Sequence, residues 1–594
     1  MKEMSDQVRV AIAAVLSLVV IVAYSLIVKP PKPPQTPEQS PSTAVVANVP
    51  VAPAAGQGTS AGLATTPAAA PPAAPITVPV VSAPAEKSVI VESGLYRVEF
   101  WNRGGVVQSW QLKNYFDDSQ PPHTLDVVHT DAARMEDAWP FSVVLTDQQQ
   151  QEAANSGLYV ITSNGAPAGD TIKAPAQIEL TWSDGHLEVR KVLKFAADYM
   201  MTGELTVTLD GKPIPANLAW RGGFGNLVVR TGMMSRGVLP VQVLYSQSGK
   251  LTTLPAQRVG QSKQPTVPST IYGPLDYAGI EDQYFAAVFL PPAPAVGTAV
   301  TAAPQLALTD WAVDLNVQQA DKVVPQPNAE MAAGTGTAGP FDFRLFVGPK
   351  SLDELKSLQP PLDDILQFGW FTILSEPIFY ALRWIHRFVP NWGWAVIVFT
   401  LAINMLFYPL KIKSMRAAQK MQKAAPEIKA IQEKYKKYGM RDPRKAKMNE
   451  EVMAVYSREG INPLGSCWPM LLQLPFWWAF YRVLYYSIEL RHAPWLLWIR
   501  DLSAPDPYYV LPVLAGVTML ITTRMTPTPT TDPGQKRMMM IMPLMFCFWL
   551  IYYPSGLALY ILVGNFVATA QQWYLNRTMP MAVKSSRGWG GKKN

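Results

Sequence analysis

Residues 392–410 (WGWAVIVFTLAINMLFYPL) and 464–486 (LGSCWPMLLQLPFWWAFYRVLYY) enclose a basic segment that decides the fold. Each apolar stretch has the length that an α-helix needs to cross a hydrocarbon core of roughly 30 Å. Between them, residues 411–460 carry many Lys and Arg residues but only six acids. Because short loops rich in Lys and Arg stay in the cytoplasm, this segment orients the spans on either side of it.

Three further apolar stretches follow, at 508–524, 538–553 and 556–574. Alternation of these spans, counted from the cytoplasmic basic segment, places the C-terminal tail, 576–594, in the cytoplasm. The tail contains Arg and Lys residues but no acid, which agrees with this location. The sequence therefore predicts a five-helix membrane core over 391–575.

The N-terminus predicts a sixth span. Residues 8–28 are predominantly apolar, longer than the core of a usual signal peptide, and not followed by a small-x-small cleavage site. We therefore expect an uncleaved anchor over 1–29, which gives six spans with both termini in the cytoplasm. Residues 30–85 are rich in Pro and Ala and nearly uncharged, so they predict a semi-rigid tether.

Composition limits the classes of function. The chain has 594 residues, 48% of them hydrophobic, and a formal net charge of +7. The excess of Lys and Arg lies beside apolar stretches, while the middle of the chain is acidic. This distribution indicates charge at a membrane surface rather than DNA binding. Ribosomal RNA beside a membrane remains an open partner. The two cysteines and five histidines form no metal-ligand motif, so we expect no metal site, no cofactor and no redox chemistry.

Residues 86–350 predict a large β-sandwich. Apolar and polar residues alternate over 88–102 and 187–209, and turn signals such as Asp184-Gly185 and Asp210-Gly211 punctuate them. The region has no nucleophile-elbow, zinc-protease or P-loop motif. Asp276, Glu281 and Asp282 lie close enough in the sequence to suggest a catalytic acid/base pair. We favour the alternative that these acids form turns or are solvated.

Residues 351–390 predict a linker and an amphipathic helix. Apolar residues recur at helical spacing from Phe368 to Phe388, and Trp370 and Trp384 suit the plane of a membrane interface. An ordinary helix packed on a soluble domain is the alternative.

The basic segment itself predicts an antiparallel helical hairpin. Met421, Ile428 and Ile431 begin an apolar stripe that Val452 and Val455 continue. Gly439 is expected to end the first helix, and Asp442-Pro443 to start the second. Pro426 should kink the first helix.

Several motifs go beyond composition. They are 391–393 (NWG), 408–410 (YPL), 462–469 (NPLGSCWP), 501–512 (DLSAPDPYYVLP) and 554–560 (PSGLALY). Together these motifs closely resemble the YidC family of membrane protein insertases over about 362–574. More loosely, the whole chain resembles the Gram-negative members, which have an anchor, a large periplasmic domain and a five-helix core in the inner membrane.

The resemblance implies an insertase and chaperone rather than an enzyme. It would take up nascent membrane proteins from the ribosome and signal-recognition machinery, alone or with the Sec translocon, without nucleotide hydrolysis. The family has a polar groove open to the cytoplasm and to lipid. Such a groove lowers the barrier for a hydrophilic tail, because unpaired polar groups in hydrocarbon cost several kcal/mol each.

The sequence departs from the family at one groove position. Many members carry an arginine where this chain has Asn404, which keeps hydrogen-bonding capacity but lacks a positive charge. Arg482 lies near the other end of its span, so we expect it to snorkel to the outer interface. The sequence therefore predicts a polar groove without the positive charge that would attract acidic tails at this position.

The resemblance and the intramembrane polar residues together suggest two sets of functional residues. Expected groove residues are Thr400, Asn404, Gln473, Thr518, Thr522 and Tyr560, followed by Asn565 and Gln571. Expected contacts of the hairpin with ribosomes or targeting factors are Lys420, Lys434, Lys437, Arg441 and Arg444. Each groove residue has an alternative role as an interhelical hydrogen bond that holds the bundle.

Two other classes of protein are alternatives to an insertase. A transporter would have paired ionisable residues at mid-membrane and inverted repeats, and the sequence shows neither. A membrane-anchored carbohydrate-active enzyme would use the β domain, but no catalytic constellation stands out there. Deleting residues 86–340 distinguishes the enzyme from the insertase, because loss of growth support would favour the enzyme and retained support would favour the insertase core.

Overall fold

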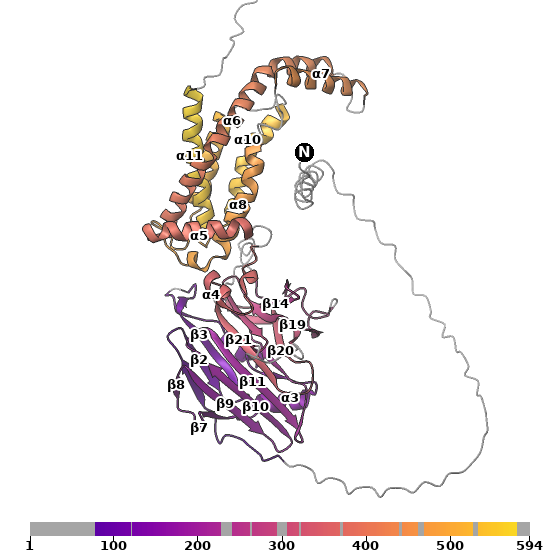
Figure 1. Cartoon of the computed structure of the whole chain (residues 1–594), viewed down its shortest axis with the longest axis vertical. Coiled ribbons are helices and arrows are strands. Elements are labelled where there is room, and N and C mark those ends of the chain that lie inside the picture. Colours follow the sequence, from indigo (N-terminus) through magenta and orange to yellow (C-terminus); the bar gives the residue numbers. More distant parts are fainter. Residues whose placement is uncertain are drawn as a thin grey trace, which may run out of the picture. The chain divides into compact units, whose positions relative to one another are not determined.

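The computed structural model describes residues 78–119, 121–226, 240–261, 264–293, 306–319, 322–368, 372–436, 438, 442–460, 468–526 and 533–578. The predicted anchor, the linker up to residue 77 and the basic tail beyond residue 578 lie outside these residues. A β-rich part comes first in the described chain and a helical part follows it (Figure 1).

The described residues of the β-rich part form three sheets and two short helices, α2 (Thr130–Glu136) and α3 (Gln148–Ser156). The first sheet has the order β4 (Thr124–Asp126), β3 (Val106–Phe116), β2 (Tyr96–Trp101), β1 (Ser88–Glu92) and β8 (Thr171–Lys173). The second has the order β15 (Lys250–Pro255), β14 (Gln242–Gln247), β17 (Tyr277–Glu281), β18 (Phe285–Leu290), β21 (Phe341–Pro349), β11 (Met200–Leu209), β10 (Leu187–Phe195), β9 (Ala176–Ser183), β6 (Val160–Ser163) and β7 (Ala166–Pro167), with β12 (Lys212–Pro213) beside β11. The third has the order β16 (Ser269–Ile271), β19 (Ala307–Gln319), β20 (Lys322–Gly334), β13 (Asn217–Trp220) and β5 (Val143–Val144).

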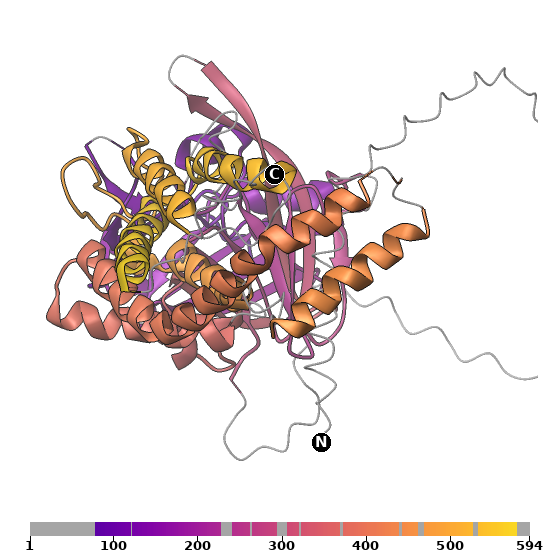
Figure 2. The ribbon, with the colours of Figure 1, turned by 90° about the horizontal axis from the view of Figure 1, so that it is seen from above.

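Local sequence explains these strands. Buried and half-buried residues alternate along β1 and β2, as a strand with one face on the core requires. The predicted turn glycines Gly185 and Gly211 both have positive φ, at 101° and 74°, which a residue without Cβ adopts readily. The strands β19 and β20 pair over their whole length as a long ribbon (Figure 2). The prediction of a β-rich domain is confirmed.

Aromatic rings join the three sheets into one core. The Trp110 ring, on β3, lies 6.2 Å from the Phe195 ring on β10 and 6.1 Å from the Trp220 ring on β13. Each of these three side chains is nearly or fully buried. The sheets therefore pack on one another through large apolar side chains, as in sandwich architectures.

A buried lysine bridges separate loops beneath this core. Lys191 is 1% exposed, and its Nζ donates hydrogen bonds to the carbonyl oxygens of Gly104 (2.9 Å), Gly105 (2.9 Å) and Phe141 (2.8 Å). The ammonium also lies 5.0 Å from the centre of the Tyr159 ring. Because it satisfies three buried carbonyls at once, Lys191 is a structural residue of the β domain.

The helical part follows the last strand. Its elements are α4 (Leu352–Ser357), η2 (Asp363–Leu366), α5 (Thr372–Phe388), α6 (Trp392–Lys434), α7 (Arg444–Arg458), α8 (Trp468–Tyr486), η4 (Ile488–Leu490), α9 (Val510–Met525), α10 (Pro533–Leu550) and α11 (Ser555–Thr578). Helix α11 packs against α9 and α6, α10 against α9, and α5 against α8.

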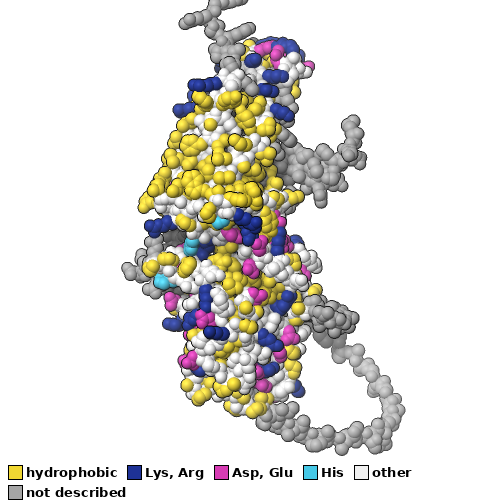
Figure 3. All heavy atoms as spheres, turned by 60° about the vertical axis from the view of Figure 1, so that its left-hand side comes forward, with side chains coloured by type: hydrophobic (Ala, Val, Ile, Leu, Met, Phe, Trp, Pro, Cys, Tyr) yellow, Lys and Arg dark blue, Asp and Glu magenta, His cyan; other side chains and the backbone are white. Residues whose placement is uncertain are grey.

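The outer surface of the helices is apolar. Among the described residues, α6 is the one helix that is long and apolar enough by itself to cross a membrane, and α9 and residues 537–550 are shorter apolar helices. Met405, Leu544 and Met545 are 75%, 60% and 68% exposed. Figure 3 shows a band of hydrophobic side chains over the helical part, with Lys and Arg near both of its ends. This surface suits lipid rather than water.

Helix α5 has apolar residues on more than one face. Ile378, Leu382 and Ile385 are buried, in line with the predicted stripe, whereas Trp384 and Phe388 are 61% and 70% exposed. A helix that buries one apolar face and exposes another is typical of a segment lying in a membrane interface.

The second half of α6 and α7 form a helix pair (Figure 2). Met421 and Ile428 on α6 are buried with Val455 on α7, as the apolar stripe predicts. Ion pairs join Glu427 to Arg458 and Lys434 to Glu451, and this pairing requires antiparallel helices. Pro426 lies inside α6, and Asp442 accepts a hydrogen bond from the first backbone N–H of α7.

Replacing Lys191 with Met should destabilise the β domain. Three buried carbonyl groups would lose their donor, which predicts a loss of about 3 kcal/mol or more from the free energy of unfolding. Urea-dependent proteolysis of the full-length protein measures the change. Lys194→Met, at an exposed position on the same strand, is the control and should have little effect. Equal stability of the two variants would contradict the structural role.

Candidate functional site

The five helices α6, α8, α9, α10 and α11 surround a cavity of about 510 Å³. Its lining combines apolar side chains with amides, hydroxyls and one amine. The lining residues are Ile403, Asn404, Phe407, Leu410, Lys411, Gln473, Trp477, Met519, Thr522, Thr526, Phe546, Tyr560, Ile561, Gly564, Asn565, Ala568 and Gln571. Polar groups from helices far apart in the sequence therefore meet in one space within an apolar bundle.

The structure brings together most of the predicted groove residues. Asn404, Gln473, Thr522 and Tyr560 line the cavity, as do Asn565 and Gln571.

Two of the predicted residues are not part of the lining. Thr400 is fully buried and its hydroxyl donates to the carbonyl oxygen of Val396 on the same helix (2.6 Å). Thr518 is buried as well, and its hydroxyl donates to the carbonyl oxygens of Leu514 (2.8 Å) and Ala515 (3.0 Å). A threonine in a membrane helix can satisfy itself on its own backbone, so these two side chains present no free polar group to the cavity.

Hydrogen bonds hold the cavity's amides in place. Asn404 Nδ2 donates to the carbonyl oxygen of Thr400 (2.8 Å), and Gln571 Nε2 donates to the carbonyl oxygen of Asn404 (3.4 Å). Asn565 Nδ2 donates to the carbonyl oxygen of Ala515 on α9 (3.1 Å). These bonds connect α6, α9 and α11, while each amide oxygen remains able to accept a further bond.

A glycine leaves room beside Asn404. A Cβ added to Gly564 would come within 3.9 Å of both Asn404 Nδ2 and the Thr400 methyl. Small residues at this kind of position let two membrane helices approach closely.

Lys411 is a cavity residue that the sequence pattern places in the basic loop instead. The structure places Lys411 on α6 at the cavity, where its Nζ donates to the carbonyl oxygen of Ala568 (3.1 Å) and to Gln571 Oε1 (3.1 Å). It is the one charged side chain among the described lining residues. The sequence does not show that the helix continues beyond the apolar stretch. Helix α6 runs unbroken past Pro409, so a residue two turns beyond Asn404 still faces the cavity.

The β domain contacts the C-terminal end of α8 and the loop after it. Gln283 Nε2, in the turn between β17 and β18, donates to the carbonyl oxygen of Tyr485 (2.9 Å). Asp282 fixes this turn by accepting bonds from the backbone N–H groups of Tyr284 (2.7 Å) and Phe285 (2.6 Å). Asp282 is therefore a turn residue, in line with the favoured sequence interpretation.

A polar chain continues this contact. Glu281 and Lys350 form a fully buried ion pair at 2.8 Å. Glu281 Oε1 also accepts a hydrogen bond from Gln367 Nε2 (2.7 Å), and the Gln367 carbonyl accepts one from Arg482 Nη1 on α8 (3.2 Å). Arg482 Nη1 further donates to the Tyr486 hydroxyl (2.9 Å). The strand β17 is thus linked to α8 through one linker residue.

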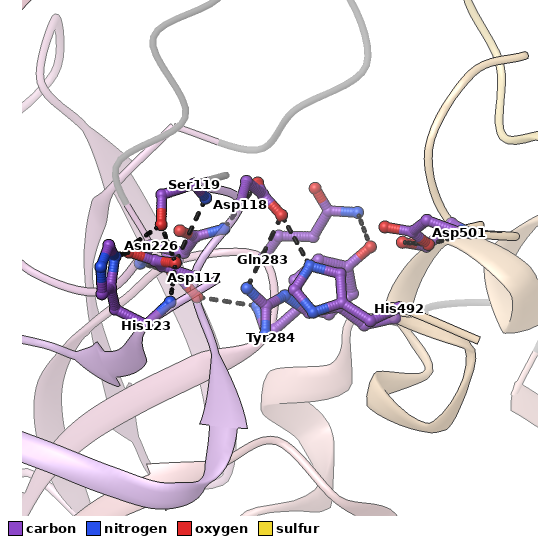
Figure 4. Close-up of polar contacts among 12 residues, drawn as sticks. Asp117, Asp118, Ser119, His123, Asn226, Gln283, Tyr284, His492 and Asp501 are labelled. Carbon is purple, nitrogen blue, oxygen red and sulfur yellow. Dashed lines mark hydrogen bonds and ion pairs between the residues drawn. The ribbon is translucent and has the colours of Figure 1, made fainter. Parts of the chain in front are cut away.

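A second link joins the loop at Asp118 to the loop after α8 (Figure 4). Asp118 Oδ1 lies 2.7 Å from His492 Nε2, and its Oδ2 accepts a bond from Asn226 Nδ2 (2.9 Å). Arg491 Nη2 lies 3.9 Å from Asp118 Oδ1. Burial raises the pKa of Asp118, but the hydrogen bonds and the charge of Arg491 outweigh burial and lower this pKa to about 2. The carboxylate is therefore ionised at neutral pH.

The same region contains a group of possible metal ligands. One ligand atom each from Asp118, His492 and Asp501 lies within 4.8 Å of the others, which the scattered histidines of the sequence did not reveal. The Asp118 carboxylate already has the positively charged Arg491 beside it. A neighbouring guanidinium disfavours a divalent cation, so the arrangement fits an ion-paired junction better than a metal centre.

The predicted contact residues of the hairpin have different surroundings. Lys420 is exposed on α6. Lys434 pairs with Glu451 (2.9 Å), and Arg444 pairs with Asp442 (3.0 Å) and stacks on the Tyr438 ring. Lys437 and Arg441 lie outside the described residues.

Two protein-family models match this chain, one over the β-rich part and one over the helical part. The family model described as "YidC periplasmic domain" matches residues 88–381, and the one described as "60Kd inner membrane protein" matches residues 384–582. The membrane protein insertase YidC of Geotalea daltonii is 31% identical over 96% of this chain and 99% of its own length. That of Geobacter metallireducens is 30% identical over 97% and 99%, respectively.

A further relative matches a shorter region more closely. The YidC insertase of Aromatoleum aromaticum is 44% identical over 41% of this chain and 43% of its own length. A solved structure of an active YidC insertase covers 84% of this chain at 17% identity, with a TM-score of 0.34. On its near full-length matches to curated relatives and on both family models, the chain belongs to the YidC family of membrane protein insertases, which are inner-membrane proteins with a periplasmic β-rich domain and are not enzymes.

Proposed function

We propose that the 510 Å³ cavity is the groove through which this insertase receives the hydrophilic tail of a nascent membrane protein. The observation that carries the proposal is the meeting of amides and an amine inside helices whose outer faces are apolar. The adjoining hydrophobic segment of the client would pass from this groove into lipid.

The physical reason is the price of exposing polar peptide to hydrocarbon. A backbone or side-chain polar group costs several kcal/mol when it is moved from water to hydrocarbon without a partner. Asn404, Gln473 and Gln571 offer hydrogen-bond donors and acceptors to such a group. The free-energy barrier to crossing falls because polar groups of the tail that lose their hydrogen bonds to water gain hydrogen bonds to the protein.

Insertion in this scheme proceeds without nucleotide. Burying about 20 apolar residues in lipid releases enough free energy to drive the process, at roughly 25 cal/mol per Å² of apolar surface. The sequence offers no P-loop that would hold a nucleotide.

The proposed topology has six spans and both termini in the cytoplasm. The anchor would occupy 1–29, the tether 30–85, the periplasmic β-sandwich 86–350, the interfacial segment 351–390, the core 391–575 and the basic tail 576–594. The apolar outer faces of the helices and the basic charge of the α6–α7 pair support this assignment. The α6–α7 pair is then a cytoplasmic hairpin.

The proposed partners follow from this topology. The basic hairpin and tail would meet the ribosome or targeting machinery, which carries negative charge. Clients that need a wider passage would reach this chain from the Sec translocon, beside which it would lie in the bilayer.

Asn404→Leu should slow insertion of clients with polar N-terminal tails by roughly tenfold, because a hydrogen-bonding group worth about 1 kcal/mol or more is lost from the groove. The measurement is protease protection of a client in vesicles that contain the purified full-length protein and no nucleotide. Met405→Leu, at the neighbouring exposed position, is the control. An unchanged rate in Asn404→Leu would reject the groove, and a requirement for nucleotide in the unmodified protein would reject the proposed energetics.

Lys411→Gln should selectively slow clients whose tails carry Asp or Glu. The amine is the positive charge of the cavity, and it replaces the charge that Asn404 does not supply. The same vesicle assay, with paired clients that differ only in Asp→Asn changes of the tail, measures the ratio of the two rates. Lys413→Gln, at an exposed position on α6, should leave the ratio unchanged. A ratio that Lys411→Gln does not alter would show that this amine does not select clients.

A photocrosslinker at Lys420 should capture ribosomal or targeting-factor components when nascent chains are being delivered. Lys420 is exposed on the basic half of α6, so a probe there samples the surface of the hairpin. A probe at Ile373, on the exposed face of α5, is the control and should capture lipid. Recovery of lipid alone from both positions would contradict the proposed contact.

A further inference from the structure

A second cavity, of about 540 Å³, lies where the β14–β15 hairpin, η2, the start of α5 and the C-terminal part of α8 meet. It is separate from the groove, and no lining residue is common to the two. Five charged side chains of both signs line it: Lys250, Asp363, Asp364, Glu376 and Arg482.

The carboxylates that line this cavity favour a cation. Asp363 and Asp364 are consecutive residues in η2. Burial raises the pKa of Asp364, and the negative charge of Asp363 raises it further, so this pair gains stability when a positive group approaches. Glu376 already has a partner, because Lys356 Nζ lies 3.0 Å from its carboxylate.

The basic side chains that line the cavity favour an oxyanion. The Arg482 hydrogen bonds to Gln367 and Tyr486 both use Nη1, and an arginine has five N–H donors in a fork that suits phosphate. Lys250 is exposed at the turn of the β14–β15 hairpin and adds a second positive charge. A ligand that satisfies both sets of side chains therefore carries both an amine and an anion.

The cavity's neighbours place it at a lipid surface. It borders the first turns of α5 through Thr372 and Glu376. The same helix exposes Ile373 (82%), Trp384 (61%) and Phe388 (70%), which are the side chains of an interfacial helix. A lipid whose acyl chains lie along α5 would have its headgroup level with the cavity.

We propose that this cavity binds the headgroup of an aminophospholipid, with the phosphate at Arg482 and Lys250 and a primary ammonium at Asp363 and Asp364. Ethanolamine fits better than choline, because a primary ammonium donates three hydrogen bonds and a quaternary one donates none. The inference rests on the proposed function in one respect, which is that α5 lies in the outer membrane interface.

Native mass spectrometry of the full-length protein, released from nanodiscs of equal phosphatidylethanolamine, phosphatidylcholine and phosphatidylglycerol content, tests the proposal. The ethanolamine lipid should be retained in about tenfold excess over the other two, because each of them lacks one of the charge-assisted contacts. The double variant Asp363→Asn, Asp364→Asn should lose this excess over the choline lipid. Asp210→Asn, on an exposed turn of the β domain, is the matched control and should keep it.

Two competition experiments distinguish a lipid site from a site for soluble amino-phosphates. If free phosphoethanolamine displaces the retained lipid but dodecyl phosphocholine does not, the headgroup is what the cavity recognises. Tight binding of free phosphoethanolamine without any retained lipid would overturn the assignment to lipid. Lys250→Gln changes an exposed side chain and should fold normally. This variant should retain less of the ethanolamine lipid, so it tests the proposal even if the double variant is unstable.

Equal retention of all three lipids by the unmodified protein would overturn the proposal. This outcome is distinct from failure of the groove, because client insertion in vesicles of phosphatidylcholine and phosphatidylglycerol measures the groove without any aminophospholipid. A protein that inserts clients there yet shows no headgroup preference would refute the lipid site alone.

Discussion

The hydrogen bonds that join α6 to α11 around Asn404 and Lys411 are the interactions on which the functional structure depends. Gln571 contacts both residues, through the Asn404 carbonyl oxygen and the Lys411 amine. In hydrocarbon, a polar side chain without a partner costs several kcal/mol, so these groups are tolerable only because they satisfy one another or meet water. These residues also line the cavity of about 510 Å³. The residues that join α6 to α11 are therefore the same ones that line the proposed groove.

The β domain is attached to the core through polar contacts rather than through an apolar interface alone. The buried pair Glu281–Lys350 anchors Gln367, and Gln367 contacts Arg482 on α8. Asp118 and His492 make a second contact nearby. Helix α8 therefore takes part both in this attachment and, through Gln473, in the lining of the cavity. Removing one partner of a buried ion pair typically costs about 3–5 kcal/mol, so this attachment is sensitive to single substitutions.

Much of this arrangement could be predicted from the sequence, for physical reasons that differ between regions. Alternation along β1 and β2 and the glycines at 185 and 211 identify strands and turns, because these signals are local. The stripe of Met421, Ile428 and Val455 identifies the helix pair for the same reason. The family resemblance rests on motifs, and the near full-length relatives confirm it.

What the sequence could not reveal depends on rotation and distance in space. Thr400 and Thr518 are polar residues in apolar segments, yet their hydroxyls bond to their own helices, which no sequence pattern indicates. Lys411 looked like a loop residue because the end of a span is judged by hydropathy, whereas α6 continues to Lys434. The meeting of Asp118 with His492 joins residues far apart in the chain. Six spans and the location of each terminus remain predictions.

The most direct test of the central claim is whether water reaches the cavity. In a full-length variant without its two native cysteines, single cysteines at Asn404 and Met405 occupy consecutive positions on α6, one lining the cavity and one exposed on the outer surface. Their rates of reaction with a charged, water-soluble thiol reagent are compared in vesicles. The account predicts fast labelling at 404 and slow labelling at 405. Equally slow labelling at both positions would contradict it.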